Sequence, residues 1–135
     1  MMSDMERAAH YLLDIIQSLE KISDFLNGIT AEEFSADEMR QDAVHMRLLI
    51  IGEAVNNIQQ KYPALLERHP EIPWRLIRGM RNKIAHEYFN INPLRTWSTA
   101  QEDLPVLKKA IDQIKTSEPE LAEILAELSE ASQQN

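Results

Sequence analysis

The chain has 135 residues, a hydrophobic fraction of 44%, no cysteine and a formal net charge of −8. This length suits one ordinary domain, and the missing cysteines exclude disulfides, thiol nucleophiles and thiolate metal sites. The longest apolar run, at residues 48–51, is far shorter than the roughly 20 residues of a membrane span, and the first residues lack a secretory-signal pattern, so we expect a soluble cytoplasmic protein.

The first half of the chain is predicted to form two long helices. Apolar residues recur there at three- and four-residue intervals, and no segment alternates as a strand does. The first helix is expected to begin after Ser3 or Asp4 as N-cap and to end near Asn27-Gly28. Ser35 and Glu38 predict a capping box that opens the second helix, which runs to Tyr62. The two helices are expected to form an antiparallel hairpin.

The second half is predicted to add two or three helices. After a proline-punctuated connection, a third helix is expected over residues 74–88. Asn92-Pro93 predicts the start of a fourth helix, which Pro105 must kink or break. Pro119 restarts a short acidic helix that frays from Ser132. We therefore predict one all-α domain over residues 1–135, a four- to five-helix up-and-down bundle with its core at about 5–115 and an acidic C-terminal helix and tail at 117–135.

Positive charge is concentrated in the third predicted helix. Residues 74–86 hold four basic and no acidic side chains, whereas the rest of the chain carries −12. Nucleic-acid affinity comes largely from basic residues that neutralise phosphates, so we expect weak general RNA affinity with one local attractive patch. The candidate RNA and phosphate ligands are Arg75, Arg78 and Lys83.

Helical periodicity gives this segment two faces. One face points to the core and comprises Leu76, Ile77, Met80 and Ile84. The opposite, polar face comprises Arg75, Arg78, Asn82 and His86. Gly79 and Ala85 flank the polar face, and such small residues leave room for a phosphate backbone or for a second copy of the protein.

Arg81 and His86 suit phosphodiester chemistry without a metal. A guanidinium can hold a phosphate through two hydrogen bonds, and an imidazole exchanges protons near neutral pH. No metal ligand set is expected, because the histidines do not pair at the spacing of a helical metal face. Arg81 and His86 lie about 140° apart on an ideal helix. The arginine could curl round, the helix could loosen, or a second subunit could complete the pair; we favour the last.

Two further pairs of positions carry packing predictions. Tyr88 follows Arg81 by seven residues, which places the two side chains on nearly the same line of a helix. Glu53 lies on an otherwise apolar helix and needs a partner, for which Arg47 or an arginine of residues 74–86 is a candidate. Gly52, beside it, is expected to permit close helix packing.

The run from Arg81 to His86 with Tyr88 resembles the signature of HepT toxins in the HEPN superfamily. The resemblance covers roughly residues 5–114. It includes further similar words in the order of the chain: Asp42-Ala43-Val44, Ile50-Ile51-Gly52-Glu53-Ala54, Ile72-Pro73-Trp74, Arg78-Gly79-Met80-Arg81-Asn82, His86-Glu87-Tyr88-Phe89 and Glu102-Asp103-Leu104-Pro105.

This resemblance implies a HEPN-like bundle that dimerises through the motif helices and acts as a metal-independent endoribonuclease toxin of a type VII-like toxin–antitoxin system. It implies His86 as the base that activates a ribose 2′-OH, Arg81 as the group that stabilises the phosphate, and Asn82 and Arg78 in support, with no cofactor. It also implies an MntA-like nucleotidyltransferase antitoxin that silences the toxin by transferring AMP to Tyr88. A non-catalytic module that binds a nucleotide or a partner is the main alternative, and a purely structural helical subunit is the third.

Overall fold

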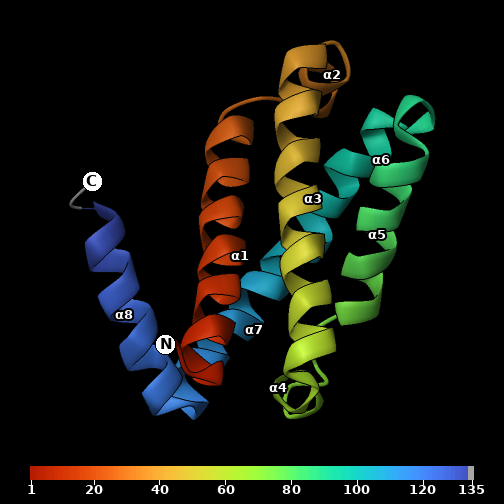
Figure 1. The fold of residues 1–135 in the computed structure, drawn as a ribbon. Helices are drawn as coiled ribbons and strands as arrows, with labels where there is room; N and C mark the ends of the chain where they lie inside the picture. The colour runs from red at the N-terminus through yellow and green to blue at the C-terminus, as the bar shows by residue number, and fades with distance from the viewer. Residues whose placement is uncertain (134–135) are drawn as a thin grey trace.

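The computed structural model describes residues 1–133, and every regular element in this range is helical. The long helices are α1 (Asp4–Leu26), α3 (Glu38–Lys61), α5 (Trp74–His86), α7 (Leu104–Ser117) and α8 (Pro119–Gln133). Successive long helices run in alternating directions, as predicted for an up-and-down bundle (Figure 1). None of the helices in this range is long and apolar enough to cross a bilayer.

Two short helices, α2 (Ala31–Ser35) and α4 (Pro63–Glu67), lie in connections for which no helix was predicted. A third, α6 (Pro93–Ser98), forms the start of the predicted fourth helix. The capping box predicted at Ser35 is wrong: Asp37 caps α3, and the box is formed by Thr30 and Glu33 at the start of α2. Thr30 and Glu33 have the same spacing as the predicted pair, so the motif was assigned to the wrong helix.

The predicted interruption before Pro105 takes the form of a widened turn. A π-helical segment, η2 (Thr99–Asp103), joins α6 to α7, and Pro105 lies in the first turn of α7. Proline donates no backbone hydrogen bond, so a helix tolerates it best in the first turn. The wide turn places Pro105 there while the chain continues in a similar direction.

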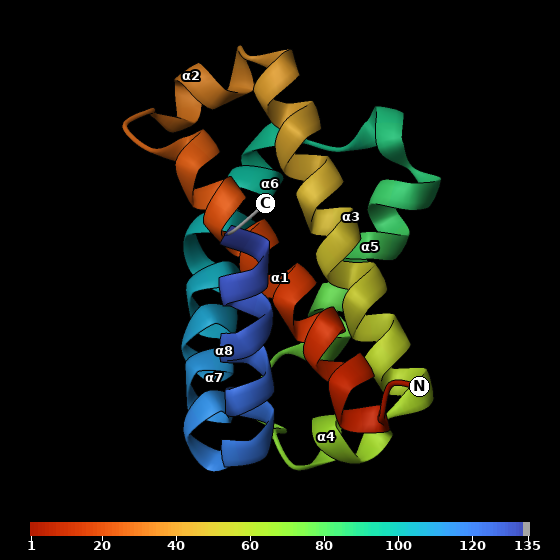
Figure 2. The ribbon, with the colours of Figure 1, turned by 60° about the vertical axis from the view of Figure 1, so that its left-hand side comes forward.

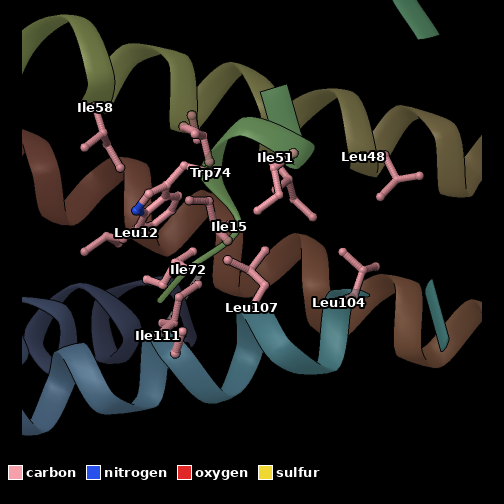
Figure 3. Packing of buried hydrophobic residues seen from close by; sticks show 14 of the residues in the cluster. Leu12, Ile15, Leu48, Ile51, Ile58, Ile72, Trp74, Leu104, Leu107 and Ile111 are labelled. Atoms are coloured by element: carbon pink, nitrogen blue, oxygen red, sulfur yellow. The ribbon is translucent and has the colours of Figure 1, made fainter. Parts of the chain in front are cut away.

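The core lies between α1, α3 and α7. In Figure 3, apolar side chains from these three helices point toward one another, and Trp74 at the start of α5 enters beside Leu12 and Ile15. The Trp74 indole donates a hydrogen bond to the His69 carbonyl at 3.0 Å, so the buried indole nitrogen has a partner. The apolar periodicity read from the sequence therefore identifies the buried faces of α1, α3 and α7.

α8 covers α1 and α7 on the side remote from α5 (Figures 1 and 2). Leu121 and Leu125 are buried against them, while the glutamates of α8 are exposed to solvent. The helix continues through Gln133, so the fraying predicted from Ser132 is wrong for residues 132–133, and the rest of that prediction lies outside the described residues.

α5 lies at the edge of the bundle and packs mainly against α3 (Figure 1). Ile77 and Ile84 are buried and Met80 packs on the core, as predicted. Leu76, in contrast, is 50% exposed, because a helix packed on a single neighbour buries a narrower stripe than periodicity assigns to it. α5 thus presents a wide surface beside α3, and the candidate site lies on it.

Candidate functional site

Gly52 brings α5 close to α3 at the position of Arg81. A Cβ atom added at Gly52 would lie 2.2 Å from the Arg81 Cβ and 3.3 Å from the Arg81 Cα. Only a glycine permits this approach, as the sequence predicted. The main chain of α5 at Arg81 is therefore held directly against α3.

The Arg81 guanidinium is held on both sides. It forms an ion pair with the Glu53 carboxylate, which is the partner predicted for Glu53 from this helix. Its Nη1 also donates a hydrogen bond to the Asn82 Oδ1 at 3.2 Å. The ion pair and the hydrogen bond fix the orientation of the planar Arg81 guanidinium. The side chain remains 30% exposed, so the guanidinium is still accessible.

A hollow of about 300 Å³ opens beside Arg81 between α3 and α5. Its wall contains three arginines, two asparagines and the backbone of two glycines: Arg75, Arg78, Arg81, Asn56, Asn82, Gly52 and Gly79. The Arg78 Nε is buried and has no hydrogen-bond partner among residues 1–133. With Glu53 counted, the arginines leave two positive charges, and the arrangement suits an anion of phosphate size.

His86 lies at the last position of α5, one turn beyond Asn82, and is exposed. Four residues of helix rise about 6 Å and turn about 400°, so His86 continues the polar face of Arg78 and Asn82 without lining the hollow. Within one chain the structure brings Arg75, Arg78, Arg81 and Asn82 together and leaves His86 beside them. A complete site for Arg81 and His86 is therefore not formed by contacts within one chain.

Lys83 occupies a different surface. It lines a larger groove of about 960 Å³ between α5, α6 and the α4–α5 connection, together with the apolar side chains of Leu76, Met80 and Ile91. Arg75 and Arg78 line this groove as well as the hollow beside Arg81, which we call the arginine hollow. Lys83 lines the larger groove but not the arginine hollow.

Tyr88 departs from the predicted arrangement. α5 ends at His86, and Tyr88 begins a single 3₁₀ turn, η1 (Tyr88–Asn90). Its hydroxyl donates a hydrogen bond to the carboxylate of Asp42 on α3. Asp42 and Glu53 are three turns apart on α3, about 16 Å along its axis, so the predicted contact between Tyr88 and Arg81 is wrong within one chain.

The ring of Tyr88 also packs on a buried histidine. The edge-to-face contact with His45 has a centroid distance of 5.8 Å and an interplanar angle of 79°. The His45 Nε2 lies 2.8 Å from the Thr96 Oγ1, and burial lowers the pKa of His45 although Asp42 acts in the opposite direction. His45 is therefore a neutral, buried side chain that supports the Tyr88 ring. No three histidine or carboxylate side chains in residues 1–133 are grouped as metal ligands.

The sequence reasoning missed the roles of Asn56 and Asp42. A signal for them is present in the sequence, because polar residues at positions 42, 45, 53 and 56 recur at helical spacing along one side of α3. Where such a row of polar residues on one helix faces a neighbouring helix, it indicates the positions that contact side chains of that neighbour.

Comparison with known proteins identifies the group to which this arrangement belongs. Residues 15–114 match the family model described as "Ribonuclease HepT-like". The chain belongs to the HepT-like ribonuclease family. This family match includes α3, α5 and every predicted site residue from Arg75 to Tyr88.

Individual relatives agree with the family match. A protein of Thermococcus cleftensis named "Probable ribonuclease HepT" is 41% identical over 105 residues, which are 78% of this chain and 93% of the relative. A Caldanaerobacter subterraneus protein named "Putative RNase TTE0752" is 36% identical over 84% of this chain and 99% of its own length. No solved structure gives a significant match. The similarity thus spans nearly the full length of these HepT-like relatives.

Proposed function

We propose that the protein is a metal-independent endoribonuclease that acts as the toxin of a toxin–antitoxin pair. The observation that carries this proposal is the arginine hollow between α3 and α5, in which Glu53 and Asn82 orient Arg81 and the buried Arg78 Nε has no partner. An RNA phosphate supplies the acceptor oxygens that these donors need. The names of the relatives cited above, which refer to ribonucleases, support the same substrate class.

The reaction assigned to the site is transesterification by the ribose 2′ oxygen. His86 takes the 2′-OH proton, the 2′ oxygen attacks the phosphorus, and the bond to the 5′ oxygen breaks as that oxygen takes up a proton. Arg81 and Arg78 stabilise the negative charge on the phosphate. The products carry a 2′,3′-cyclic phosphate and a 5′-OH.

The active form is proposed to be a homodimer with α5 at the interface. α5 packs on one side only, Ala85 is exposed, and a Cβ at Gly79 would meet nothing within 4 Å. If two α5 helices cross near Ala85, the sequence spacing places His86 and Tyr88 of one subunit opposite Arg81 of the other. The dimer thereby supplies the pairing of Arg81 and His86 that one chain lacks.

The regulatory part of the proposal is AMP transfer to Tyr88 by an MntA-like nucleotidyltransferase antitoxin. Tyr88 is 41% exposed and its hydroxyl lies at the protein surface, where an enzyme can reach it. In the proposed dimer the added nucleotide points at the other subunit's arginines. Its phosphate then competes with RNA for them.

An RNA cleavage assay in EDTA tests the catalytic part. The native protein should cleave RNA to cyclic-phosphate ends, and His86→Ala should abolish cleavage. His10→Ala removes another exposed histidine, on α1, and should retain full activity. Equal inertness of the unmodified native protein and His86→Ala, with RNA still bound, contradicts the nuclease and favours a binding module.

A further inference from the structure

Tyr88 makes two contacts with α3, and these contacts do more than anchor the short turn η1. Asp42 accepts the hydroxyl hydrogen bond, and His45, itself held by Thr96, packs against the ring. The adjacent Phe89 is 98% exposed, so η1 does not serve to bury apolar area. The contacts with α3 instead fix the position of the Tyr88 hydroxyl and influence its protonation.

The electrostatic surroundings keep this hydroxyl protonated at rest. The hydrogen bond to Asp42 is the main cause that raises the pKa of Tyr88, and burial and the negative charges of Asp42 and Glu38 act in the same direction. A protonated phenol is a weak nucleophile. The oxygen therefore needs a proton acceptor at the moment of attack, and the Asp42 carboxylate is already hydrogen-bonded to it.

We propose that Asp42 orients the Tyr88 hydroxyl and accepts its proton during AMP transfer, an inference that rests on the proposed function. The Tyr88 oxygen attacks the α-phosphorus of ATP held by the nucleotidyltransferase, and the bond from that phosphorus to the β-bridging oxygen breaks. Pyrophosphate leaves with the bonding electrons, and the phenol proton passes to Asp42 and then to solvent. An aspartate that accepts a hydroxyl proton has the same role in protein kinases.

After AMP transfer, the modified Tyr88 side chain cannot keep its contact with Asp42. The modified oxygen has no proton to donate to Asp42, and the new phosphodiester carries a negative charge next to the carboxylates of Asp42 and Glu38. Like charges at this distance repel, and the Asp42 carboxylate loses its hydrogen-bond donor. Transfer thus releases Tyr88 from α3 and frees it to carry the nucleotide toward the arginine hollow.

Initial rates of AMP transfer test the role of Asp42. The purified full chain is incubated with an MntA-like nucleotidyltransferase and ATP, and intact mass is followed against toxin concentration. Asp42→Asn retains a hydrogen-bond acceptor of nearly equal shape and loses the basic carboxylate. We expect kcat to fall by about 10²-fold or more with KM for the toxin unchanged.

Two matched variants separate proton acceptance from structure. Glu38→Gln removes the neighbouring carboxylate that makes no hydrogen bond to Tyr88 and should stay within about twofold of the native rate. Asp42→Glu restores a carboxylate and should transfer AMP faster than Asp42→Asn. Equal melting temperatures of the unmodified variants exclude a folding defect.

The possible outcomes distinguish this inference from the proposed function. Tyr88 labelled at the native rate in Asp42→Asn overturns the role of Asp42 and leaves the proposed acceptor intact. Labelling of Tyr88→Phe, or no labelling of the native chain, overturns the assigned acceptor and the role of Asp42 together.

Discussion

Substituting Gly52 by alanine tests whether the close approach of α3 and α5 positions Arg81. The new Cβ would lie 2.2 Å from the Arg81 Cβ, whereas carbon atoms pack at about 3.5 Å or more. The obstructing atom is next to the main chain, so a rotamer change cannot move it away. α5 must shift outward by more than about 1 Å, and Arg81 moves with it, away from Glu53.

Two opposing effects determine the stability of Gly52→Ala. Alanine improves helix propensity by about 1 kcal/mol, whereas overpacking costs about 1–3 kcal/mol. Weakening the half-exposed Arg81–Glu53 pair costs at most about 1 kcal/mol more. The net effect is a fall in the free energy of unfolding of up to about 3 kcal/mol. We expect RNA cleavage to fall by about 10²-fold, because an error of about 1 Å in a catalytic group has that effect.

Gly79→Ala is the matched control in the facing helix. Its Cβ would meet nothing within 4 Å, so we expect only the gain in helix propensity, about 1 kcal/mol in chemical denaturation. Urea unfolding is measured for both variants, and cleavage in EDTA is compared between Gly52→Ala and the native protein, because Gly79 itself lines the hollow. A Gly52→Ala protein as stable as Gly79→Ala and as active as the native protein would refute the role assigned to the close approach.

Three further predictions concern the junction of α7 and α8, the interface and α2. The hydrogen bond from Arg68 lowers the pKa of Glu118, so the ionised Glu118 stabilises the fold above its unfolded-state pKa, and this stabilisation is lost as pH falls through its folded-state pKa. The free energy of unfolding of Glu118→Gln in urea should therefore depend less on pH between about pH 5 and pH 3 than that of the native protein. Ala85→Glu, at the proposed crossing of the two α5 helices, should give a monomer without RNA cleavage in light scattering and activity assays, whereas Val106→Glu, an exposed position on α7, should remain dimeric. Phe34→Ala should lose about 3–5 kcal/mol of stability in thermal unfolding, because this fully buried ring fixes α2.

The sequence predicted the long helices well because their burial is strongly one-sided or their ends are chemically marked. Ser3 caps α1, Gly28 adopts a positive φ of 76° after it, and Asn92 caps α6, each as expected from residue type. α2 and α4 have five residues each and show less than two turns of periodicity. Their position is set by contacts such as the packing of Phe34 on Trp97, which the local sequence does not reveal.

The candidate site was predictable in its residue types and only partly in its geometry. The need of Glu53 for a cation and the presence of Gly52 together indicated a helix held close by an arginine, and the structure confirms both. The placement of Tyr88 failed because the spacing argument assumed a continuous helix. α5 ends two residues earlier, and a carboxylate on α3, distant in sequence, then determines where the phenol lies.

The separation of Tyr88 from Arg81 divides the proposed regulation into two parts that one variant can distinguish. Asp42 and Tyr88 belong to one chain and touch, so acceptance of AMP requires no second copy. Silencing requires the nucleotide to reach an arginine that the same chain holds about 16 Å farther along α3. The monomeric Ala85→Glu variant should therefore accept AMP on Tyr88 at close to the native rate although it cleaves no RNA. If it dimerises normally or accepts AMP far more slowly than the native chain, modification and dimer assembly are not separable in this way.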